Sequence, residues 1–309
     1  MIWEDDLDKL EPNEKSAIVN ALDVKEADIK RVSVLKKGMT NCSVLFECCG
    51  KKYILRIPGE GTDRLINRLQ EAAVYQVIRG KGICDSNIYI NPDNGYKIAE
   101  YLDGSRVCDP RDKRDVIKCM NKLHELHDKK LVVDHEFDIF AQIDFYESLW
   151  PKKCSEYKDY FEVKEKVFSL KEYIKVHVNE WVLAHIDAVP DNFLFFKDKE
   201  ENERVQLIDW EYAGMQDPHI DIAMFAIYAF YDKQQIDELI QIYCGKDYTD
   251  EIRVKIYCYV SACGLLWSNW CEYKRALGVD FGEYSRRQYD YAKDYYDVVR
   301  STMGIETER

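Results

Sequence analysis

The stretch that decides the fold is His185-Ile186-Asp187-Ala188-Val189-Pro190-Asp191-Asn192, which runs directly into the apolar segment Phe193-Leu194-Phe195-Phe196. A second apolar segment, Val205 to Asp209, follows after a polar turn. We interpret this pattern as a loop fixed between short strands, followed by a second strand that ends in an aspartate. A loop held in this way can direct Asp187 and Asn192 toward one point, which Asp209 can also reach.

These residue types suit phosphoryl transfer. The acceptor hydroxyl must be oriented and must lose its proton, so one carboxylate has to face it, and we assign that role to Asp187. Magnesium prefers hard oxygen ligands, which the amide of Asn192 and the carboxylate of Asp209 offer. The competing interpretation is a chance loop that contains a helix cap, and the two apolar strands at the right distance make it the weaker one. The sequence therefore predicts a kinase-like site that uses Mg²⁺ and ATP.

The bulk composition limits the partners. The chain has 309 residues, of which 46% are hydrophobic and 33% charged, as in an ordinary globular protein with room for two lobes. A formal net charge of −13 makes it a poor general binder of nucleic acid or of anionic membranes and fits a cationic acceptor better. The longest apolar run, Ile222 to Tyr231, is about half of what a membrane-spanning helix needs. We expect small-molecule substrates and neither nucleic acid nor a membrane as partner.

The cysteines indicate the compartment. There are 11, an odd number, and no Cys-x-x-Cys pair occurs. This pattern argues against a zinc ribbon and is typical of reduced thiols in a cytoplasmic protein.

The order of predicted elements indicates two lobes in an α+β arrangement. The N-terminal part reads as a small antiparallel sheet with helices, formed by helix 11–22, strands 29–46 (interrupted at 37–41) and 51–57, helix 65–79, and strands 87–90 and 96–102. The part after Gly104 reads as mostly helical, with helices at 112–127 and 161–179, short strands at 181–184, 193–196 and 205–209, and helices over most of 221–303. We place the boundary after Asp103, with an ATP-covering lobe at 1–103 and a catalytic and acceptor-binding lobe at 104–309.

From about Leu35 to Tyr295 the chain resembles the choline/ethanolamine kinase and aminoglycoside phosphotransferase superfamily, which has a two-lobed protein-kinase-like fold. The segments that carry the resemblance are His185 to Asn192, Ile208-Asp209-Trp210-Glu211-Tyr212 and Asp217-Pro218-His219-Ile220-Asp221-Ile222-Ala223. In the N-terminal part, Gly38-Met39-Thr40-Asn41, Tyr53 to Gly59, Gly61-Thr62 and Ile66-Asn67-Arg68 are similar to bacterial choline kinases. The resemblance implies that Asp221 supports the catalytic loop, and we expect His185 to hold the same loop by hydrogen bonds.

The resemblance also implies the nucleotide contacts, at Gly38, Thr40, Asn41, Arg56, Glu71, Glu100 and Leu102. Arg56 stands where protein kinases carry a strand lysine on the ATP phosphates, and its fork of donors can also bind phosphate. Glu71 is the candidate partner that orients Arg56, although a solvated glutamate on a helix face is the alternative. The connector would hold adenine through backbone groups of Glu100 and Leu102.

Aromatic residues in the C-terminal part suit a quaternary ammonium, which has no hydrogen-bond donors and binds to aromatic faces. Trp267 and Trp270 lie on one side of a predicted helix. The resemblance carries these two and Tyr291 over to the choline site, with Glu211 as a carboxylate near the ammonium. Weaker candidates are Tyr228 and Tyr231. The alternative is that aromatics at helical spacing form core.

We therefore interpret the chain as a Mg-dependent kinase that phosphorylates the hydroxyl of choline. Ethanolamine, an aminoglycoside or thiamine stay open as acceptors, as does a nucleotide-binding pseudokinase scaffold. The pair His124 and His127 is interpreted as surface or packing residues rather than a metal site. The oligomeric state is left open.

Overall fold

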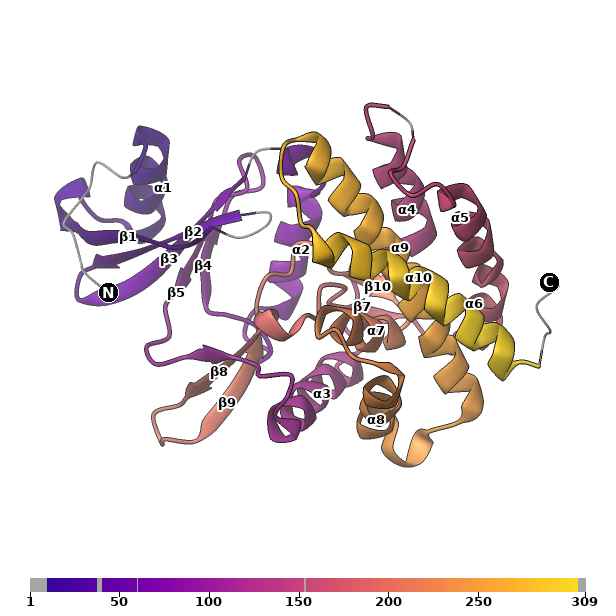
Figure 1. Cartoon of the computed structure of the whole chain (residues 1–309). Helices are drawn as coiled ribbons and strands as arrows, with labels where there is room; N and C mark the ends of the chain where they lie inside the picture. The colour runs from indigo at the N-terminus through magenta and orange to yellow at the C-terminus, as the bar shows by residue number, and fades with distance from the viewer. Residues whose placement is uncertain (1–9, 38–40, 60, 153, 305–309) are drawn as a thin grey trace. The chain divides into compact units, whose positions relative to one another are not determined.

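The structure is a computed structural model that describes residues 10–37, 41–59, 61–152 and 154–304 (Figure 1). Its helices are α1 (Pro12–Leu22), α2 (Arg68–Ile78), α3 (Lys113–Asp128), α4 (Ile139–Ser148), α5 (Tyr160–Ser169), α6 (Lys171–His177), α7 (His219–Tyr228), α8 (Lys233–Cys244), α9 (Asp250–Ala276) and α10 (Glu283–Thr302). Its strands are β1 (Ile29–Lys37), β2 (Asn41–Cys48), β3 (Lys51–Pro58), β4 (Asn87–Ile90), β5 (Lys97–Glu100), β6 (Arg106–Val107), β7 (Val182–Ala184), β8 (Phe193–Lys197), β9 (Glu203–Leu207) and β10 (Gly214–Gln216).

The chain divides into two compact units, each built from two segments. The N-terminal unit comprises residues 1–107 and 194–212, and the helical unit comprises residues 108–193 and 213–309. The sequence had placed 194–212 with the second lobe. This segment joins the N-terminal unit because β8 pairs with β6 and because the amide of Leu207 donates to the carbonyl of Ile83 at 2.9 Å.

The N-terminal unit contains a five-stranded antiparallel sheet in the order β1-β2-β3-β5-β4. In the register, Arg56 on β3 lies between Ser43 on β2 and Lys97 on β5. Helix α1 packs its buried Ile18 into the apolar core that also contains Phe46 from the sheet. The predicted small antiparallel lobe is therefore confirmed.

Helix α2 carries the first charged residues of the site. It begins at Arg68, later than the predicted Leu65, because the side-chain oxygen of Asn67 caps it by accepting from the next backbone amides at 3.2 Å. Residues 62–64 form a short 3₁₀ turn instead. The cap places Glu71 in the first turn of the helix, where its side chain is buried.

The helical unit is built around α9, a helix of 27 residues that is buried along most of its length. Helices α10, α7 and α4 pack on it. Gly264 permits the close approach of α10, because a Cβ atom there would lie 2.6 Å from the carbonyl oxygen of Gln288. The mostly helical character predicted for this part is confirmed.

The structure also differs from the predicted elements in detail. The single helix expected at 161–179 is divided at Leu170 into α5 and α6. The elements α4, β6 and β10 had no counterpart in the prediction.

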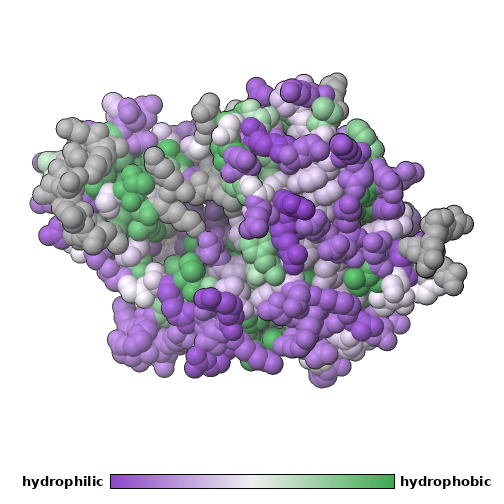
Figure 2. All heavy atoms as spheres, viewed as in Figure 1, coloured by the Kyte–Doolittle hydropathy of each residue, from purple (hydrophilic) through white to green (hydrophobic). Residues whose placement is uncertain are grey.

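The outer face of α10 is polar. Exposed residues on this helix include Glu283, Arg286, Arg287, Lys293, Asp294 and Asp297, and Figure 2 shows hydrophilic side chains over this region. The opposite face of α10 buries Tyr289 and Tyr295. Within the described residues, no helix is both long and apolar enough to cross a membrane.

Candidate active site

The loop between β7 and β8 is anchored by a buried carboxylate from α7. Asp221, in the first turn of α7, accepts hydrogen bonds from the backbone amides of His185 at 2.9 Å and Ile186 at 2.7 Å. Ile186 has a φ of 67°, in a left-handed conformation that a β-branched residue adopts only when its surroundings hold it there. The predicted role of Asp221 as a support for this loop is confirmed by these contacts.

The support continues to a histidine on α3. His127 Nε2 lies 3.0 Å from Asp221 Oδ2, and its Nδ1 lies 2.8 Å from the hydroxyl of Tyr243. His124 stacks on the same tyrosine at 4.0 Å between ring centroids. The two histidines are therefore packing residues, as interpreted from the sequence, and His127 in addition orients the carboxylate that holds the loop.

Asp187 and Asn192 are joined within the loop. The amide nitrogen of Asn192 donates to the carbonyl oxygen of Asp187 at 2.9 Å and to its carboxylate Oδ2 at 3.0 Å. The predicted proximity of these two side chains is thus present. Because the nitrogen is used in these bonds, Oδ1 of Asn192 is the atom left to serve as a metal ligand.

A series of aromatic rings lies inside the helical unit, and we call it the aromatic ladder. Its ring centroids are separated by 5.6 Å (Trp267 to Trp270), 5.1 Å (Trp270 to Phe281), 6.3 Å (Phe281 to Tyr284) and 5.4 Å (Tyr284 to Tyr228). The structure therefore brings together both predicted tryptophans and the weaker candidate Tyr228.

The charge of Asp187 acts on the two tyrosines at the end of the ladder, Tyr228 and Tyr284. Burial raises the pKa of the Tyr228 hydroxyl above its usual range, and Asp187 raises it further. Burial also raises the pKa of Tyr284, with Tyr228, Cys271 and Asp187 as further causes. The ladder thus ends close to the residue that we assign as the base.

Two ladder members, Phe281 and Tyr284, were missed from the sequence. Phe281 precedes Gly282, which caps α10, and Tyr284 is the second residue of that helix. Phe281 and Tyr284 are three residues apart, as are Trp267 and Trp270. This spacing was the one signal in the sequence from which they could have been predicted.

Two other predicted tyrosines have different surroundings. Tyr291 is 3% exposed, its hydroxyl donates to the carbonyl of Tyr231 at 2.7 Å, and the guanidinium of Arg287 lies 5.0 Å from its ring centroid. Tyr231 donates its own hydroxyl to the carbonyl of Pro110. These contacts suit packing between helices better than a ligand cage.

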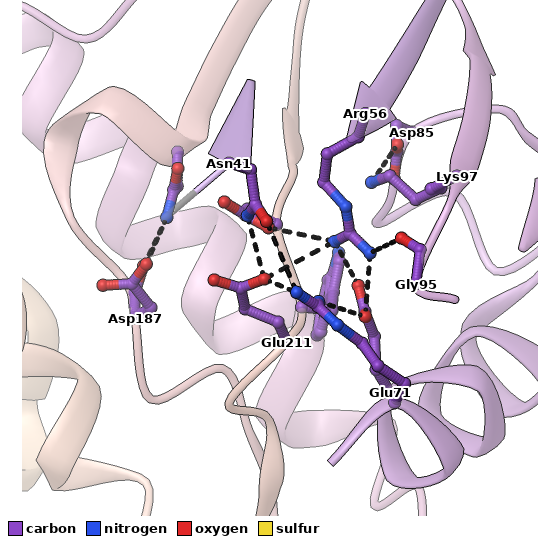
Figure 3. Close-up of polar contacts among 12 residues, drawn as sticks. Asn41, Arg56, Glu71, Asp85, Gly95, Lys97, Asp187 and Glu211 are labelled. Atoms are coloured by element: carbon purple, nitrogen blue, oxygen red, sulfur yellow. Dashed lines mark hydrogen bonds and ion pairs between the residues drawn. The ribbon is translucent and has the colours of Figure 1, made fainter. Parts of the chain in front are cut away.

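In the N-terminal unit, Arg56 and Glu71 form the predicted pair. The guanidinium of Arg56 meets both carboxylate oxygens of Glu71, with one bond at 2.9 Å, and Nη2 also donates to the carbonyl of Gly95 at 3.0 Å (Figure 3). Burial alone would raise the pKa of Glu71, but the charge of Arg56 outweighs it and the pKa lies below its usual value. The alternative of a solvated Glu71 is therefore wrong.

Glu211 lies in the same group of charges. Its Oε2 accepts from Nη1 of Arg68 at 2.9 Å and from Nδ2 of Asn41 at 2.9 Å. The sequence had placed Glu211 beside the ammonium of the acceptor, whereas these contacts occupy it with an arginine and an amide. Burial raises its pKa above the usual value, and Asp209 adds to this, against the opposing charges of Arg56 and Arg68.

We call the group formed by Asn41, Arg56, Arg68, Glu71, Asp209 and Glu211 the arginine cluster. The resemblance to kinases implies magnesium, and one carboxylate oxygen from each of Glu71, Asp209 and Glu211 lies within 4.8 Å of the others. Two of them are paired with guanidinium groups, whose charge opposes a further cation. Asp209 is the member that fits a magnesium ligand, because its side chain is 29% exposed and Arg56 approaches it only to 3.5 Å.

The backbone at Asp209 is unusual. Strand β9 ends at Leu207, so Asp209 lies beyond the strand end at which the sequence placed it. Its φ of 65° is in the left-handed region, which a non-glycine residue adopts at a cost of about 1–3 kcal/mol. Such strain is common where a side chain must be aimed at a ligand.

The connector retains the backbone groups that adenine would need. The amide of Glu100 donates to the carbonyl of Ser86 at 3.2 Å, and the carbonyl of Leu102 accepts from the amide of Ser105 at 3.2 Å. Neither bond uses the carbonyl of Glu100 or the amide of Leu102. The predicted loop residues Gly38 and Thr40 lie outside the described residues.

The chain is similar to known proteins over most of its length. The sequence profile described as "Choline/ethanolamine kinase" matches residues 32–263. The protein LicA of Haemophilus influenzae is 30% identical over 269 residues, which are 82% of this chain and 77% of that protein. The crystal structure of the choline kinase LicA from Streptococcus pneumoniae superposes with a TM-score of 0.78 at 29% identity, covering 92% of this chain and 97% of that one. A structure of LicA in complex with AMP gives 0.78 at 28% identity, covering 91% and 96%.

The fold and the charged and aromatic groups define a kinase of the protein-kinase-like class. The chain belongs to the choline/ethanolamine kinase family. The predicted recognition, fold class and enzyme class are confirmed.

Proposed function

We propose that the chain transfers the γ-phosphoryl group of ATP to the hydroxyl of choline and releases phosphocholine and ADP. The observation that carries this proposal is the aromatic ladder, whose last ring, Tyr228, has its pKa raised by burial and in part by the charge of Asp187 in the same unit. A quaternary ammonium is attracted to aromatic faces by roughly 0.5–2 kcal/mol per contact. Aromatic faces in the same unit as the base suit a small molecule with an ammonium at one end and a hydroxyl at the other.

The surroundings of Glu211 favour choline over ethanolamine. A primary ammonium has three donors and needs acceptors. Glu211, which the sequence offered as the carboxylate near the ammonium of choline, would be the candidate acceptor. That carboxylate is instead engaged by Arg68 and Asn41. Aromatic faces satisfy a trimethylammonium group, which needs no acceptor.

The chemical roles follow from the contacts. Asp187 orients the choline hydroxyl and accepts its proton as the new O–P bond forms and the bond to the leaving ADP oxygen breaks. Asn192 fixes the carboxylate of Asp187 through its amide nitrogen. Asp209 and the Oδ1 atom of Asn192 are the candidate magnesium ligands, and the metal ion would neutralise phosphate charge. Most of the rate enhancement then comes from positioning and charge compensation.

The N-terminal unit would bind the nucleotide. Arg56, oriented by Glu71 and Gly95, carries the charge for the ATP phosphates. The carbonyl of Glu100 and the amide of Leu102 would pair with adenine, while Gly38, Thr40 and Asn41 would cover the phosphates. The similarity to a LicA structure that contains AMP supports nucleotide use. The eleven free thiols suit the reducing cytoplasm, where we place the reaction.

The test is ADP release by the purified chain with Mg-ATP, comparing choline, ethanolamine and kanamycin at equal concentrations. We expect strong stimulation by choline alone and loss of activity when EDTA removes magnesium. If ethanolamine or kanamycin stimulated ADP release and choline did not, that compound would be assigned as the acceptor in place of choline. A chain that binds Mg-ATP without releasing ADP with any acceptor would support the pseudokinase scaffold.

A further inference from the structure

Arg68 is held on three sides in the N-terminal unit. Its Nη1 donates to Glu71 Oε2 at 2.9 Å and to Glu211 Oε2 at 2.9 Å, and its Nη2 donates to Asn41 Oδ1 at 3.4 Å. Its side chain is only 10% exposed. A long, flexible side chain held in this way at the first position of a helix has more contacts than helix formation requires.

The turn before β5 closes the remaining side. A Cβ atom at Gly95 would lie 2.8 Å from Nε of Arg68 and 2.7 Å from Cγ of Pro58. The carbonyl of the same glycine accepts from Nη2 of Arg56 at 3.0 Å. This turn therefore contributes to the position of both arginines. Its carbonyl accepts from Arg56, and the absence of a side chain at Gly95 leaves room for Arg68.

The two arginines share their carboxylate partners. Oε2 of Glu211 lies 2.9 Å from Nη1 of Arg68 and 3.6 Å from Nη1 of Arg56. The Glu211 side chain is only 1% exposed, so its charge is balanced by protein partners rather than by bulk water. A buried carboxylate that loses one cation attracts the other cation within reach, because an unpaired buried charge is costly.

We infer that Arg68 is a positioning residue for phosphate binding: by pairing with Glu211 it keeps Arg56 on Glu71, and it holds Asn41 against the same carboxylate. The inference rests on the proposed role of Arg56 at the ATP phosphates. Without Arg68, Glu211 draws Arg56 away from the orientation that Glu71 gives it. Asn41, which follows the nucleotide loop, then loses its contact with Arg68.

The test compares Arg68→Ala, Glu211→Gln and the double variant. We expect Arg68→Ala to raise the KM for ATP about tenfold or more, with the KM for choline changed less than about twofold. The double variant should bind ATP several-fold more tightly than Arg68→Ala, because the unpaired carboxylate is gone. Arg64→Ala, which removes an exposed arginine from the same segment, is the matched control and should resemble the wild type.

Several outcomes would overturn the inference. An unchanged KM for ATP in Arg68→Ala would do so, as would a double variant no better than Arg68→Ala, because a role of Arg68 that does not act through Glu211 predicts no rescue. If Arg68→Ala fails to fold in a thermal melt, the double variant is compared with Glu211→Gln alone. Equal ATP affinity of these two supports the inference, and weaker affinity of the double variant contradicts it.

Titration calorimetry with Mg-ATP, without any acceptor, separates this inference from the proposed function. A wild-type chain that binds ATP but is not stimulated by choline would remove the acceptor assignment. The loss and rescue of ATP affinity in the Arg68 variants would still be measured in the same experiment.

Discussion

The arginine cluster and the aromatic ladder recognise ligands by opposite means. In the cluster, two arginines and three carboxylates hold one another at fixed distances, and Glu71 and Glu211 each accept from more than one donor. In the ladder, neighbouring rings meet edge to face or tilted, with centroids 5.1 to 6.3 Å apart. Charged contacts are directional and depend on every partner, whereas ring contacts depend on area and tolerate small shifts.

Because of this difference, we expect substitutions in the two regions to have different consequences. Removal of one charge from the cluster leaves a buried partner unpaired, so the damage spreads to its neighbours. Removal of one ring from the ladder subtracts one contact and leaves the others in place. Substitutions in the cluster should therefore change ATP binding and stability together, and those in the ladder should change mainly the acceptor.

The largest effect is expected at Asp187, which serves both substrates through the transferred group. Asp187→Ala removes the group that orients the acceptor hydroxyl and accepts its proton, and should lower kcat by about 10²–10⁴-fold. ATP affinity, measured by calorimetry, should change little, because the arginine cluster is intact. Asp191→Ala, at an exposed position of the same loop, is the control. Near-wild-type turnover of Asp187→Ala would refute its assignment.

Much of the fold could be predicted because its signals are local. The alternation over β2 and β3 and the helical pattern of α1 are read within one segment each. The placement of residues 194–212 in the N-terminal unit could not be predicted in this way. It depends on the pairing of β8 with β6 and on the contact of Leu207 with Ile83, which are distant in sequence.

The same distinction holds for the site. The pair Arg56 and Glu71 could be predicted because adjacent elements carry the two residues and a known kind of kinase contact joins them. The pair Arg68 and Glu211 spans 143 positions of the chain, and no local pattern connects its members. Glu211 was therefore assigned to the acceptor site because it is close to Asp209 in the sequence. Its hydrogen-bond partners in the structure are Arg68 on α2 and Asn41.

The next largest effect is expected for Glu71→Gln in the cluster. The amide keeps the shape but removes the charge that holds Arg56, and the two arginines are left with one carboxylate fewer. We expect the KM for ATP to rise about 10- to 100-fold and the melting temperature to fall, since breaking a buried pair costs about 3–5 kcal/mol. The measurements are initial rates at varied ATP and a thermal melt.

The control for Glu71→Gln is Glu47→Gln, which breaks the more exposed pair between Glu47 and Arg31 at 3.0 Å in the same unit. Exposed pairs contribute roughly 0–1 kcal/mol, so this variant should stay close to the wild type. If both variants had the same small effect, the cluster would be no more sensitive than the surface and the comparison would fail.

A smaller effect is expected for Trp270→Leu in the ladder. It removes a ring between Trp267 and Phe281 while retaining an apolar side chain. The loss of one cation–π contact should raise the KM for choline roughly 2- to 30-fold, without changing the KM for ATP. Initial rates at varied choline, with ATP saturating, measure this split.

Tyr291→Phe sharpens the same test. It removes the hydroxyl that donates to the carbonyl of Tyr231 but leaves the ring in place, so we expect lower stability and an unchanged KM for choline. Tyr291→Leu, which removes the ring as well, should also leave that KM unchanged. A large rise in the KM for choline in Tyr291→Leu would restore Tyr291 to the acceptor site and contradict its placement outside the ladder.

The smallest effect concerns buried charges in the helical unit that serve structure alone. His219 Nδ1 lies 2.8 Å from Asp217 Oδ1, and Lys255 lies 2.6 Å from the other oxygen of Asp217. Burial lowers the pKa of His219 below its usual value, against the opposing effect of Asp217. As the pH drops, His219 is protonated in the unfolded chain near pH 6.5, whereas in the folded chain it is protonated only at lower pH. The free energy of unfolding therefore falls as the pH drops from about 7 to about 5.

This pH dependence can be isolated with His219→Asn, which removes the titrating ring. One proton contributes at most about 1.4 kcal/mol per pH unit, so the melting temperature of the wild type should fall by a few degrees more than that of the variant between about pH 7.5 and 5.5. Asp217 has a lowered pKa, because His219 and Lys255 outweigh the effect of burial, and its contribution is lost only at lower pH. Equal slopes for the two chains would show that folding does not lower the pKa of His219 and would contradict this prediction.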